Sequence, residues 1–202
     1  MPYPDRFYPV VDSVAWVARL TRLGVGTIQL RAKNLDDADA LAIVREALAV
    51  TGGTPTRLVI NDYWRAAIEA KAQHLHLGQE DVADADLKAI RAAGLTLGVS
   101  THDEEELAKG LAARPDYVAL GPIFPTTLKS MRFAPQGIAK ITDWKKRVGK
   151  IPLVAIGGIK FEQAAAIFAA GADSIAVVSD VTQNADPDAR VRQWLGENAE
   201  AA

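Results

Sequence analysis

The sequence contains no cysteine, which excludes a disulfide framework and any metal site built on thiolates. It also lacks an apolar run long enough to span a membrane, and residues 1–5 have neither the basic nor the apolar region of a signal peptide. Positive charge is not in excess, since the formal net charge is -2. No broad field therefore attracts nucleic acid or an anionic membrane, and any affinity for phosphate must be local. We expect a cytoplasmic protein.

What is present is the composition of an ordinary globular domain. The 202 residues are 49% hydrophobic and 24% charged, and no linker or low-complexity tract divides them. A chain of this length buries most of the apolar surface that its unfolded form exposes. We predict one domain over residues 1–202, with a barrel over about 6–196 and a short, flexible C-terminal tail.

The order of the predicted elements indicates a closed barrel. Strand-like apolar runs occur at 7–11, 25–33, 57–61, 72–77, 95–100, 116–121, 151–156 and 172–178. Helical patterns follow at 13–23, 36–50, 63–70, 84–92, after a capping box at Thr101–Glu104, and at 137–148, 161–170 and 187–195. Strict alternation implies parallel strands, and eight such units fit an α/β protein of the (β/α)8 TIM-barrel type. An open doubly wound sheet would normally carry a glycine fingerprint after its first strand, and Val11–Val14 has none.

The most informative stretch is QLRAK, residues 29–33. Side chains alternate along a strand, so Gln29, Arg31 and Lys33 are predicted to point to one side. Two positive charges and a carboxamide suit a diphosphate attached to a heteroaromatic ring. The alternative is a strand that runs out into solvent with charges on its last residues, and this stretch alone leaves both interpretations open.

Two aspartates follow neighbouring predicted strands. Asp62 comes directly after Asn61, and Asp81 follows the next strand. Because strand ends meet at one rim of a barrel, both carboxylates can face one point and hold Mg2+ beside Arg31 and Lys33. Each aspartate alone is better explained as a cap, Asp62 of the helix near residue 63 and Asp81 of a turn before Val82. Together with the neighbouring positive charges, they favour a metal site.

Later strand ends offer groups that suit a phosphate. Gly157–Gly158 follows the seventh strand and Val178–Ser179 the eighth, the two positions where barrels often bind phosphate. Glycines let the backbone approach an anion, although Gly-Gly alone can simply form a tight turn. The long loop after the sixth strand carries Thr126, Thr127 and Lys129, which a mobile lid could bring over a diphosphate. A solvated loop lysine is the alternative for Lys129.

The remaining notable side chains are interpreted as structural. His74 and His76 share a strand face, and no third ligand at metal spacing accompanies them. His102 lies in a capping segment and is predicted to be solvated. The four tryptophans fit helix packing, and no Ser-His-Asp order indicates a nucleophile.

Seven motifs together resemble those of the thiamine-phosphate synthase family, in the same order over the whole predicted barrel. They are QLRAK (29–33), Asn61–Asp62, HLGQED (76–81), GVSTH (98–102), ALGPIFPTTLK (119–129), VAIGGI (154–159) and AVVS (176–179). The resemblance implies an Mg2+-dependent enzyme that joins a hydroxymethylpyrimidine diphosphate to a thiazole phosphate. The expected products are thiamine monophosphate and pyrophosphate. The expected partners are these two small phosphorylated molecules, and a homo-oligomer is left open.

The same resemblance assigns residues to each part of the site. For the pyrimidine diphosphate it implies Gln29, Leu30, Arg31, Ala32, Lys33, Asn61, Ser100 and Lys129, of which Arg31, Lys33, Ser100 and Lys129 are expected to be catalytic. For the thiazole phosphate it implies Thr126, Thr127, Leu128, Gly158, Val178 and Ser179. For Mg2+ it implies Asp62 and Asp81. Leu128 departs from the family pattern, which often has a hydroxyl residue before the lysine, so only a backbone contact would survive there.

Two alternatives to a synthase remain. One is a thiazole tautomerase on the same barrel, which would not need the paired aspartates or the diphosphate-binding cations. The other is a non-catalytic protein that binds thiamine precursors, and Leu128 is its only support.

Overall fold

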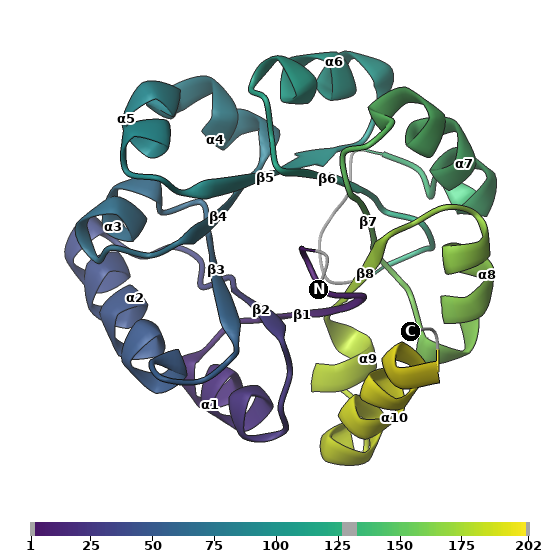
Figure 1. Ribbon diagram of the computed structural model, residues 1–202, viewed down its shortest axis with the longest axis horizontal. Helices are drawn as coiled ribbons and strands as arrows, with labels where there is room; N and C mark the ends of the chain where they lie inside the picture. Colours follow the sequence, from purple (N-terminus) through teal and green to yellow (C-terminus); the bar gives the residue numbers. More distant parts are fainter. Residues whose placement is uncertain (1–2, 127–132, 201–202) are drawn as a thin grey trace.

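Eight parallel strands form one closed barrel in the computed structural model, which describes residues 3–126 and 133–200. Each strand pairs with the next in sequence, and the last pairs with the first, with Phe7 opposite Ile175. The strands are β1 (Phe7–Val11), β2 (Thr27–Leu30), β3 (Arg57–Asn61), β4 (His74–Leu77), β5 (Thr96–Thr101), β6 (Tyr117–Leu120), β7 (Leu153–Ile156) and β8 (Ser174–Val177). Figure 1 looks into this barrel and shows the helices as an outer ring. The predicted (β/α)8 barrel is confirmed.

The helices of the described segments follow the predicted order with some additions. They are α1 (Val14–Arg22), α2 (Asp37–Thr51), α3 (Trp64–Glu69), α4 (Gln79–Asp84), α5 (Leu87–Ala92), α6 (Glu104–Ala112), α7 (Gly137–Val148), the 3-10 turn η1 (Phe161–Gln163), α8 (Ala164–Ala169), α9 (Ser179–Thr182) and α10 (Pro187–Glu200). The units after β4 and β8 each carry two helices, which the sequence did not predict. The last helix also continues past the predicted end at Leu195.

Two predicted helix starts are wrong, and a capping side chain explains each. The helix predicted over 84–92 begins later, at Leu87, because Asp86 accepts hydrogen bonds from the backbone N–H groups of Lys88 and Ala89, both at 3.0 Å, and caps α5. The capping box at Thr101 does not form, since Thr101 belongs to β5. Asp103 caps α6 instead, accepting from the Glu106 N–H at 2.8 Å. An aspartate in each case is the stronger local acceptor for orphan N–H groups.

The core has two layers, as alternation of side chains across a barrel strand requires. The outer layer lies between strands and helices and includes Ile28, Leu75 and Trp144, all fully buried. The inner layer fills the barrel and consists of Tyr8, Val10, Val59, Tyr117, Ala119, Val154 and Ala176. The two inner tyrosines are unusual for such a core, because each brings a hydroxyl that needs a partner.

The segment before β1 closes the barrel at the amino ends of the strands. The Ser174 hydroxyl donates to the Asp5 carbonyl at 2.6 Å, and the Thr27 hydroxyl donates to the Asp5 carboxylate at 2.9 Å. Asp5 also forms an ion pair with Arg57, and the Tyr3 ring stacks on His74 with 4.7 Å between centroids. Figure 1 shows this segment crossing the middle of the barrel. The inner tyrosines are therefore covered at the amino ends of the strands, opposite the rim formed by the carboxyl ends.

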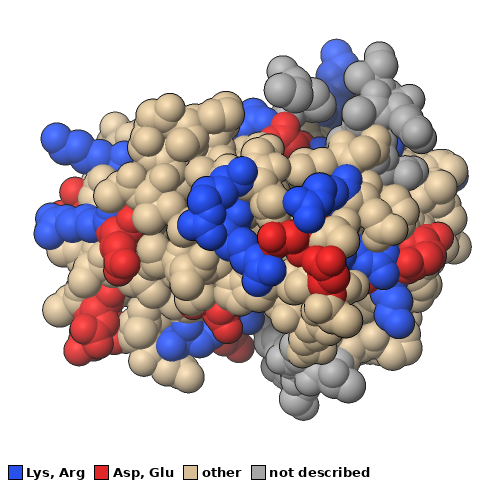
Figure 2. All heavy atoms as spheres, turned by 90° about the horizontal axis from the view of Figure 1, so that it is seen from below, with Lys and Arg blue, Asp and Glu red and all other residues tan. Residues whose placement is uncertain are grey.

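The surface charge is mixed. Figure 2 shows Lys and Arg side chains interspersed with Asp and Glu on one face of the molecule, as expected for a net charge of -2. Among the described helices, none combines the length and the apolar character that crossing a membrane requires.

Gly98 in β5 provides a test of inner-core packing. A Cβ atom there would lie 2.0 Å from Cζ of Tyr117, so the ring must shift if the residue is substituted. We expect Gly98→Ala to lower the free energy of unfolding by about 1–3 kcal/mol, the usual cost of overpacking. Urea denaturation measures it.

The matched control is Gly196→Ala in α10, where a Cβ meets nothing within 4 Å. This substitution should be neutral or raise the free energy of unfolding by up to about 1 kcal/mol. A Gly98→Ala protein as stable as the control would contradict the packing described here.

Candidate active site

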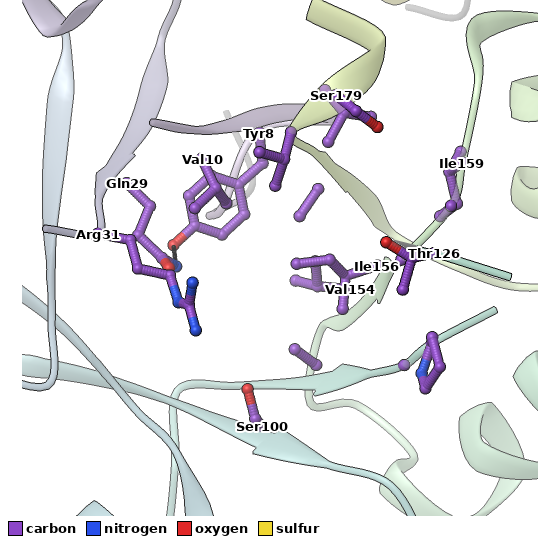
Figure 3. Close-up of a pocket in the computed structure, with 18 of the residues that line it drawn as sticks. Tyr8, Val10, Gln29, Arg31, Ser100, Thr126, Val154, Ile156, Ile159 and Ser179 are labelled. Carbon is purple, nitrogen blue, oxygen red and sulfur yellow. Dashed lines mark hydrogen bonds between the residues drawn. The ribbon is translucent and has the colours of Figure 1, made fainter. Parts of the chain in front are cut away.

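A cavity of about 390 Å³ opens at the carboxyl ends of the strands. This is the face on which barrel enzymes build their active sites. Of the residues proposed from sequence, those that line the cavity are Gln29, Arg31, Asn61, Ser100, Thr126, Gly158, Val178 and Ser179. Figure 3 shows Gln29 and Arg31 on one side and Thr126 and Ser179 on the other. Side chains from distant parts of the chain therefore share one pocket.

The QLRAK segment is a strand only at its beginning, so the predicted strand over 25–33 is too long. β2 ends at Leu30, although the Arg31 N–H still donates to the Val11 carbonyl at 2.7 Å and extends the pairing with β1. Gln29 and Arg31 face the cavity, as alternation predicts. Leu30 and Ala32 are buried outside the cavity lining, so neither offers it a side chain.

Lys33 lies at the rim and forms an ion pair with Asp62. Asp62 has a φ of 65°, a left-handed conformation that is uncommon for a residue other than glycine. Its side chain does not cap the next helix, since α3 begins after Tyr63 without a side-chain cap. The capping interpretation of Asp62 is therefore wrong. Strained backbone of this kind is often found at functional sites.

Asp81 lies in the first turn of α4 and not in a turn before it, so its capping interpretation is also wrong. The carboxylates of Asp62 and Asp81 are near enough for each to shift the pKa of the other. Burial and the neighbouring Asp62 charge raise the pKa of Asp81. Burial also acts to raise the pKa of Asp62, but the hydrogen bond and the charge of the Lys33 ammonium oppose it, and that pKa lies below its usual value. Two carboxylates thus share one ammonium group.

This arrangement has the chemistry of a divalent-cation site. Carboxylate oxygens are the ligands that Mg2+ prefers, and Mg2+ commonly takes one or two of them and fills its remaining positions with water or phosphate. No cluster of three or more His, Cys, Asp or Glu side chains suited to a metal occurs in the described part of the chain. A cation held by Asp62 and Asp81 would therefore need oxygens from water or a ligand.

The opposite wall is built by glycine backbone. Gly158 has a φ of 66°, and a Cβ there would lie 2.4 Å from the Pro125 carbonyl oxygen and 2.8 Å from that of Phe124. Only glycine fits this close approach between the loops after β6 and β7. Val178 and Ser179 complete the wall where β8 passes into the short helix α9.

A chain of buried polar side chains forms the floor of the cavity. Gln29 Nε2 donates to the Tyr8 hydroxyl at 2.7 Å, which lies 2.8 Å from the Tyr117 hydroxyl. The Tyr117 oxygen lies 2.9 Å from Nδ1 of His76, whose Nε2 lies 2.8 Å from the Ser100 hydroxyl. Burial raises the pKa of both tyrosines well above the usual value, so they remain protonated. Burial, with Arg31 and Lys33 nearby, lowers the pKa of His76 to about 4 and keeps it neutral.

Asn61 at the end of β3 has an unsatisfied donor. The residue is 4% exposed and lines the cavity, and its Nδ2 has no hydrogen-bond partner within the described structure. A buried polar atom without a partner costs free energy, so it marks a place where a ligand can accept a hydrogen bond.

Some cavity residues were missed or misjudged from the sequence. His102 is not solvated as predicted: it lines the cavity, its Nδ1 lies 2.6 Å from the Glu106 carboxylate, and its ring stacks on Phe133 at 4.8 Å. Tyr8 was taken only as part of a strand. Its position two residues before Val10, in a strand that alternates between barrel interior and helices, was the available signal. His76 is structural as predicted, but it also lines the cavity.

Three proposed residues, Thr127, Leu128 and Lys129, lie outside the residues that the structure describes. Their neighbour Thr126 lines the cavity.

Comparison with known proteins identifies the family. The family model described as thiamine monophosphate synthase matches residues 7–181. The chain belongs to this family. A thiamine-phosphate synthase of Rhizobium etli is 54% identical over 195 residues, covering 96% of both chains, and one of Salmonella dublin is 53% identical, covering 96% of this chain and 92% of its own length. Relatives with this name are transferases.

Solved structures agree with the family assignment. A thiamine phosphate pyrophosphorylase from Pyrococcus furiosus superposes with a TM-score of 0.82 at 26% identity, covering 96% of each chain. A 3-hexulose-6-phosphate synthase from Salmonella typhimurium, at 14% identity and a TM-score of 0.76, shares the fold alone. The resemblance to this family that the seven sequence motifs indicated is therefore confirmed.

The carboxylate pair of this family member should weaken the fold when no cation is bound. Because the folded-state pKa of Asp81 is raised, its proton contributes stability at low pH that is lost as the pH rises. We expect Asp81→Asn to raise the free energy of unfolding at pH 7, without Mg2+, by up to about 1 kcal/mol, the scale of a solvent-screened charge pair.

Urea denaturation across pH tests this expectation. The advantage of Asp81→Asn should shrink as the pH falls through the pKa of Asp81, where the wild type binds the proton itself. A variant that is less stable than the wild type at pH 7 would show that the two carboxylates do not repel.

Proposed function

We propose that the chain joins 4-amino-2-methyl-5-(diphosphooxymethyl)pyrimidine to 4-methyl-5-(2-phosphooxyethyl)thiazole, giving thiamine monophosphate and pyrophosphate. One observation carries the proposal: a single cavity has Arg31 and Asn61 on one side and a glycine wall on the other. The Lys33–Asp62 ion pair follows Arg31 and Asn61 closely along the chain, just past the ends of β2 and β3. Such a cavity suits one substrate with a diphosphate and a second with a single phosphate. Family membership and relatives at 53–54% identity support the same reaction. Both substrates are small polar molecules, as expected for a cytoplasmic enzyme.

The pyrimidine diphosphate is assigned to the β2 side of the cavity. Arg31 and Lys33 neutralise the diphosphate, while Gln29, Asn61 and Ser100 bind the pyrimidine ring from the floor. The orphan Nδ2 of Asn61 supports this assignment, because a ligand acceptor would satisfy it. Leu30 and Ala32 belong to the same segment, and their backbone groups are assigned to this substrate as well. Lys129 is proposed as a further cation over the diphosphate.

Asp62 and Asp81 are assigned to Mg2+. The Asp62 charge that raises the pKa of Asp81 supports this, since a divalent cation would relieve the repulsion between the two carboxylates. Mg2+, when bound, supplies positive charge beside the diphosphate. Lys33 pairs with Asp62 in the structure and is close enough to respond when that carboxylate binds a cation.

The thiazole phosphate is assigned to the opposite wall. Gly158, Val178 and Ser179 follow β7 and β8, and α9 is the short extra helix with which barrels often complete a phosphate site. Thr126 lines the same side of the cavity, and Thr127 and Leu128 are proposed beside it.

The bond changes require no general base. The bond between the methylene carbon and the diphosphate oxygen breaks, and its electron pair leaves with pyrophosphate. The thiazole nitrogen then forms the new carbon–nitrogen bond with its lone pair and loses no proton. Arg31 and Lys33 stabilise the charge that develops on the leaving group, and the cavity holds the two reactants in line.

The two alternatives differ in what they need from the site. A tautomerase moves a proton and does not need Arg31, Lys33 or the two aspartates Asp62 and Asp81 to bind a diphosphate. A binding protein would keep both substrate sites and release no pyrophosphate. Mixing both substrates with Mg2+ and measuring pyrophosphate, with and without chelator, separates all three.

Asp62→Asn tests the metal assignment. Asparagine tolerates the left-handed backbone at this position, so the variant should fold, whereas alanine would add strain. We expect pyrophosphate release at saturating Mg2+ to fall by at least about 100-fold, because a charged ligand of the leaving-group site is lost.

Asp188→Asn is the matched control, since it removes a carboxylate from an ion pair with Arg19 away from the cavity. Its turnover should equal that of the wild type. Turnover of Asp62→Asn equal to that of this control would remove Asp62 from the metal site.

Gly158→Ala tests the thiazole phosphate seat. The new Cβ would push the Pro125 and Phe124 carbonyls away and disturb the wall. We expect the KM for the thiazole phosphate to rise by about tenfold or more, with a much smaller change in the KM for the pyrimidine diphosphate.

Gly53→Ala controls for backbone strain. Gly53 also has a positive φ, 75°, but a Cβ there meets nothing within 4 Å. Both variants should lose some stability, and only Gly158→Ala should change a KM. Equal kinetics of the two variants would rule out the proposed phosphate seat.

A further inference from the structure

The floor of the cavity contains five polar side chains joined in one line of hydrogen bonds. The line begins at Gln29, passes through Tyr8, Tyr117 and His76, and ends at Ser100, with donor–acceptor distances of 2.7–2.9 Å. Its two ends and its members Tyr8 and His76 line the cavity, whereas Tyr117 lies behind them and is fully buried. A floor of apolar residues would avoid the cost of burying these groups. The line therefore calls for an explanation beyond packing.

The line has a direction, because its first bond has a fixed donor. An amide nitrogen donates hydrogen bonds and does not accept them, so the Tyr8 oxygen accepts from Gln29. Tyr8 has one hydroxyl hydrogen, and the Tyr117 oxygen at 2.8 Å is the acceptor that the described structure offers it, so we infer that Tyr8 donates there. If the Tyr117 oxygen accepts from Tyr8, its own hydrogen is free to donate to Nδ1 of His76, 2.9 Å away. A histidine that accepts at Nδ1 carries its proton on Nε2.

The direction fixes what each end offers to a ligand. His76 Nε2–H donates to the Ser100 oxygen, which leaves the Ser100 hydrogen to donate into the cavity. At the other end Gln29 uses Nε2 on Tyr8, which leaves its Oε1 as an acceptor. The orphan Nδ2 of Asn61 adds a second donor on the same floor.

We propose that Tyr8, Tyr117 and His76 are positioning residues that hold Ser100 as a donor and Gln29 as an acceptor, so that the floor selects an aminopyrimidine over its oxo counterpart. This rests on the proposed function. A 4-aminopyrimidine presents an amino donor and ring nitrogens that accept, which complements the floor. In the 4-oxo form the oxygen accepts and the adjacent ring nitrogen carries a hydrogen, so donor meets donor and acceptor meets acceptor.

Binding of the two pyrimidine diphosphates, without the thiazole, tests the proposal by isothermal titration calorimetry in Mg2+. The wild type should bind the 4-amino form at least about 100-fold more tightly than the 4-oxo form, as expected where mismatched buried hydrogen bonds decide specificity. Tyr117→Phe removes one hydroxyl that does not touch the cavity and breaks the line in its middle. We expect the preference to fall to about tenfold or less in this variant.

Two controls separate positioning from loosening of the floor. Tyr3→Phe removes a buried hydroxyl from a ring that packs edge-on against Tyr117 at 5.7 Å but lies outside the line. It should keep the wild-type preference. Pyrophosphate with Mg2+, which contacts the rim and not the floor, should bind all variants within about twofold of the wild type.

A double-mutant comparison shows whether Tyr117 acts through Ser100. In a Ser100→Ala background the further change Tyr117→Phe should lower the preference much less than it does in the wild type, because only the Gln29 end of the line remains to be held. Additive losses would mean that Tyr117 has only a packing role and would overturn the proposal.

The ring 15N chemical shifts of His76 give a readout that needs no ligand. Comparison with a His76→Gln protein assigns its signals, and the shifts should show a proton on Nε2 and none on Nδ1. A proton on Nδ1 reverses the line and overturns the proposal, even if turnover is normal. Failure of the wild type to bind the 4-amino diphosphate overturns the proposed function as well, whereas tight binding with an unchanged preference in Tyr117→Phe overturns this inference alone.

Discussion

Closure of the parallel barrel is the constraint on which the rest of the structure depends. Because every strand runs in the same direction, each ends at one rim, and residues as far apart as Gln29 and Ser179 line one cavity. Alternation along each strand then divides the side chains between an outer core and the barrel interior. The segment around Asp5 closes the other end of the barrel. Polar groups inside the barrel are therefore covered on one side and meet a ligand on the other.

The rim and the floor hold polar groups in different ways. At the rim Asp62 and Asp81 lie close together with one ion pair to Lys33, so their negative charges are left partly unbalanced. On the floor, Tyr8 and Tyr117 each satisfy their hydroxyl through a neighbour in the line. An unbalanced rim favours binding of a charged ligand, whereas a satisfied floor can favour one hydrogen-bonding pattern over another.

The sequence predicted what depends on composition and short-range pattern. Strand–helix alternation was enough to predict the barrel fold. The polar residues near the ends of the strands, such as Asn61 and Ser100, were enough to locate the rim. What it could not predict depends on contacts between distant strands. Nothing local to Tyr117 shows that its hydroxyl lies 2.9 Å from His76, 41 residues earlier. His102 was misjudged for the same reason, because its surroundings include Phe133 from another loop.

The position of the cations relative to the floor bears on how the reaction can remain selective. In the proposed reaction, ionisation of the pyrimidine needs positive charge at the diphosphate, and this attraction is the same for any diphosphate, whichever ring it carries. Discrimination must therefore come from neutral groups that are buried deeply enough to make an unmatched hydrogen bond costly. Gln29 and Asn61, each 4% exposed, meet that requirement, whereas Lys33 at the rim does not. A barrel can separate binding of the diphosphate from discrimination of the ring. Residues early in a strand are buried in the interior, and residues that follow the strand are exposed at the rim.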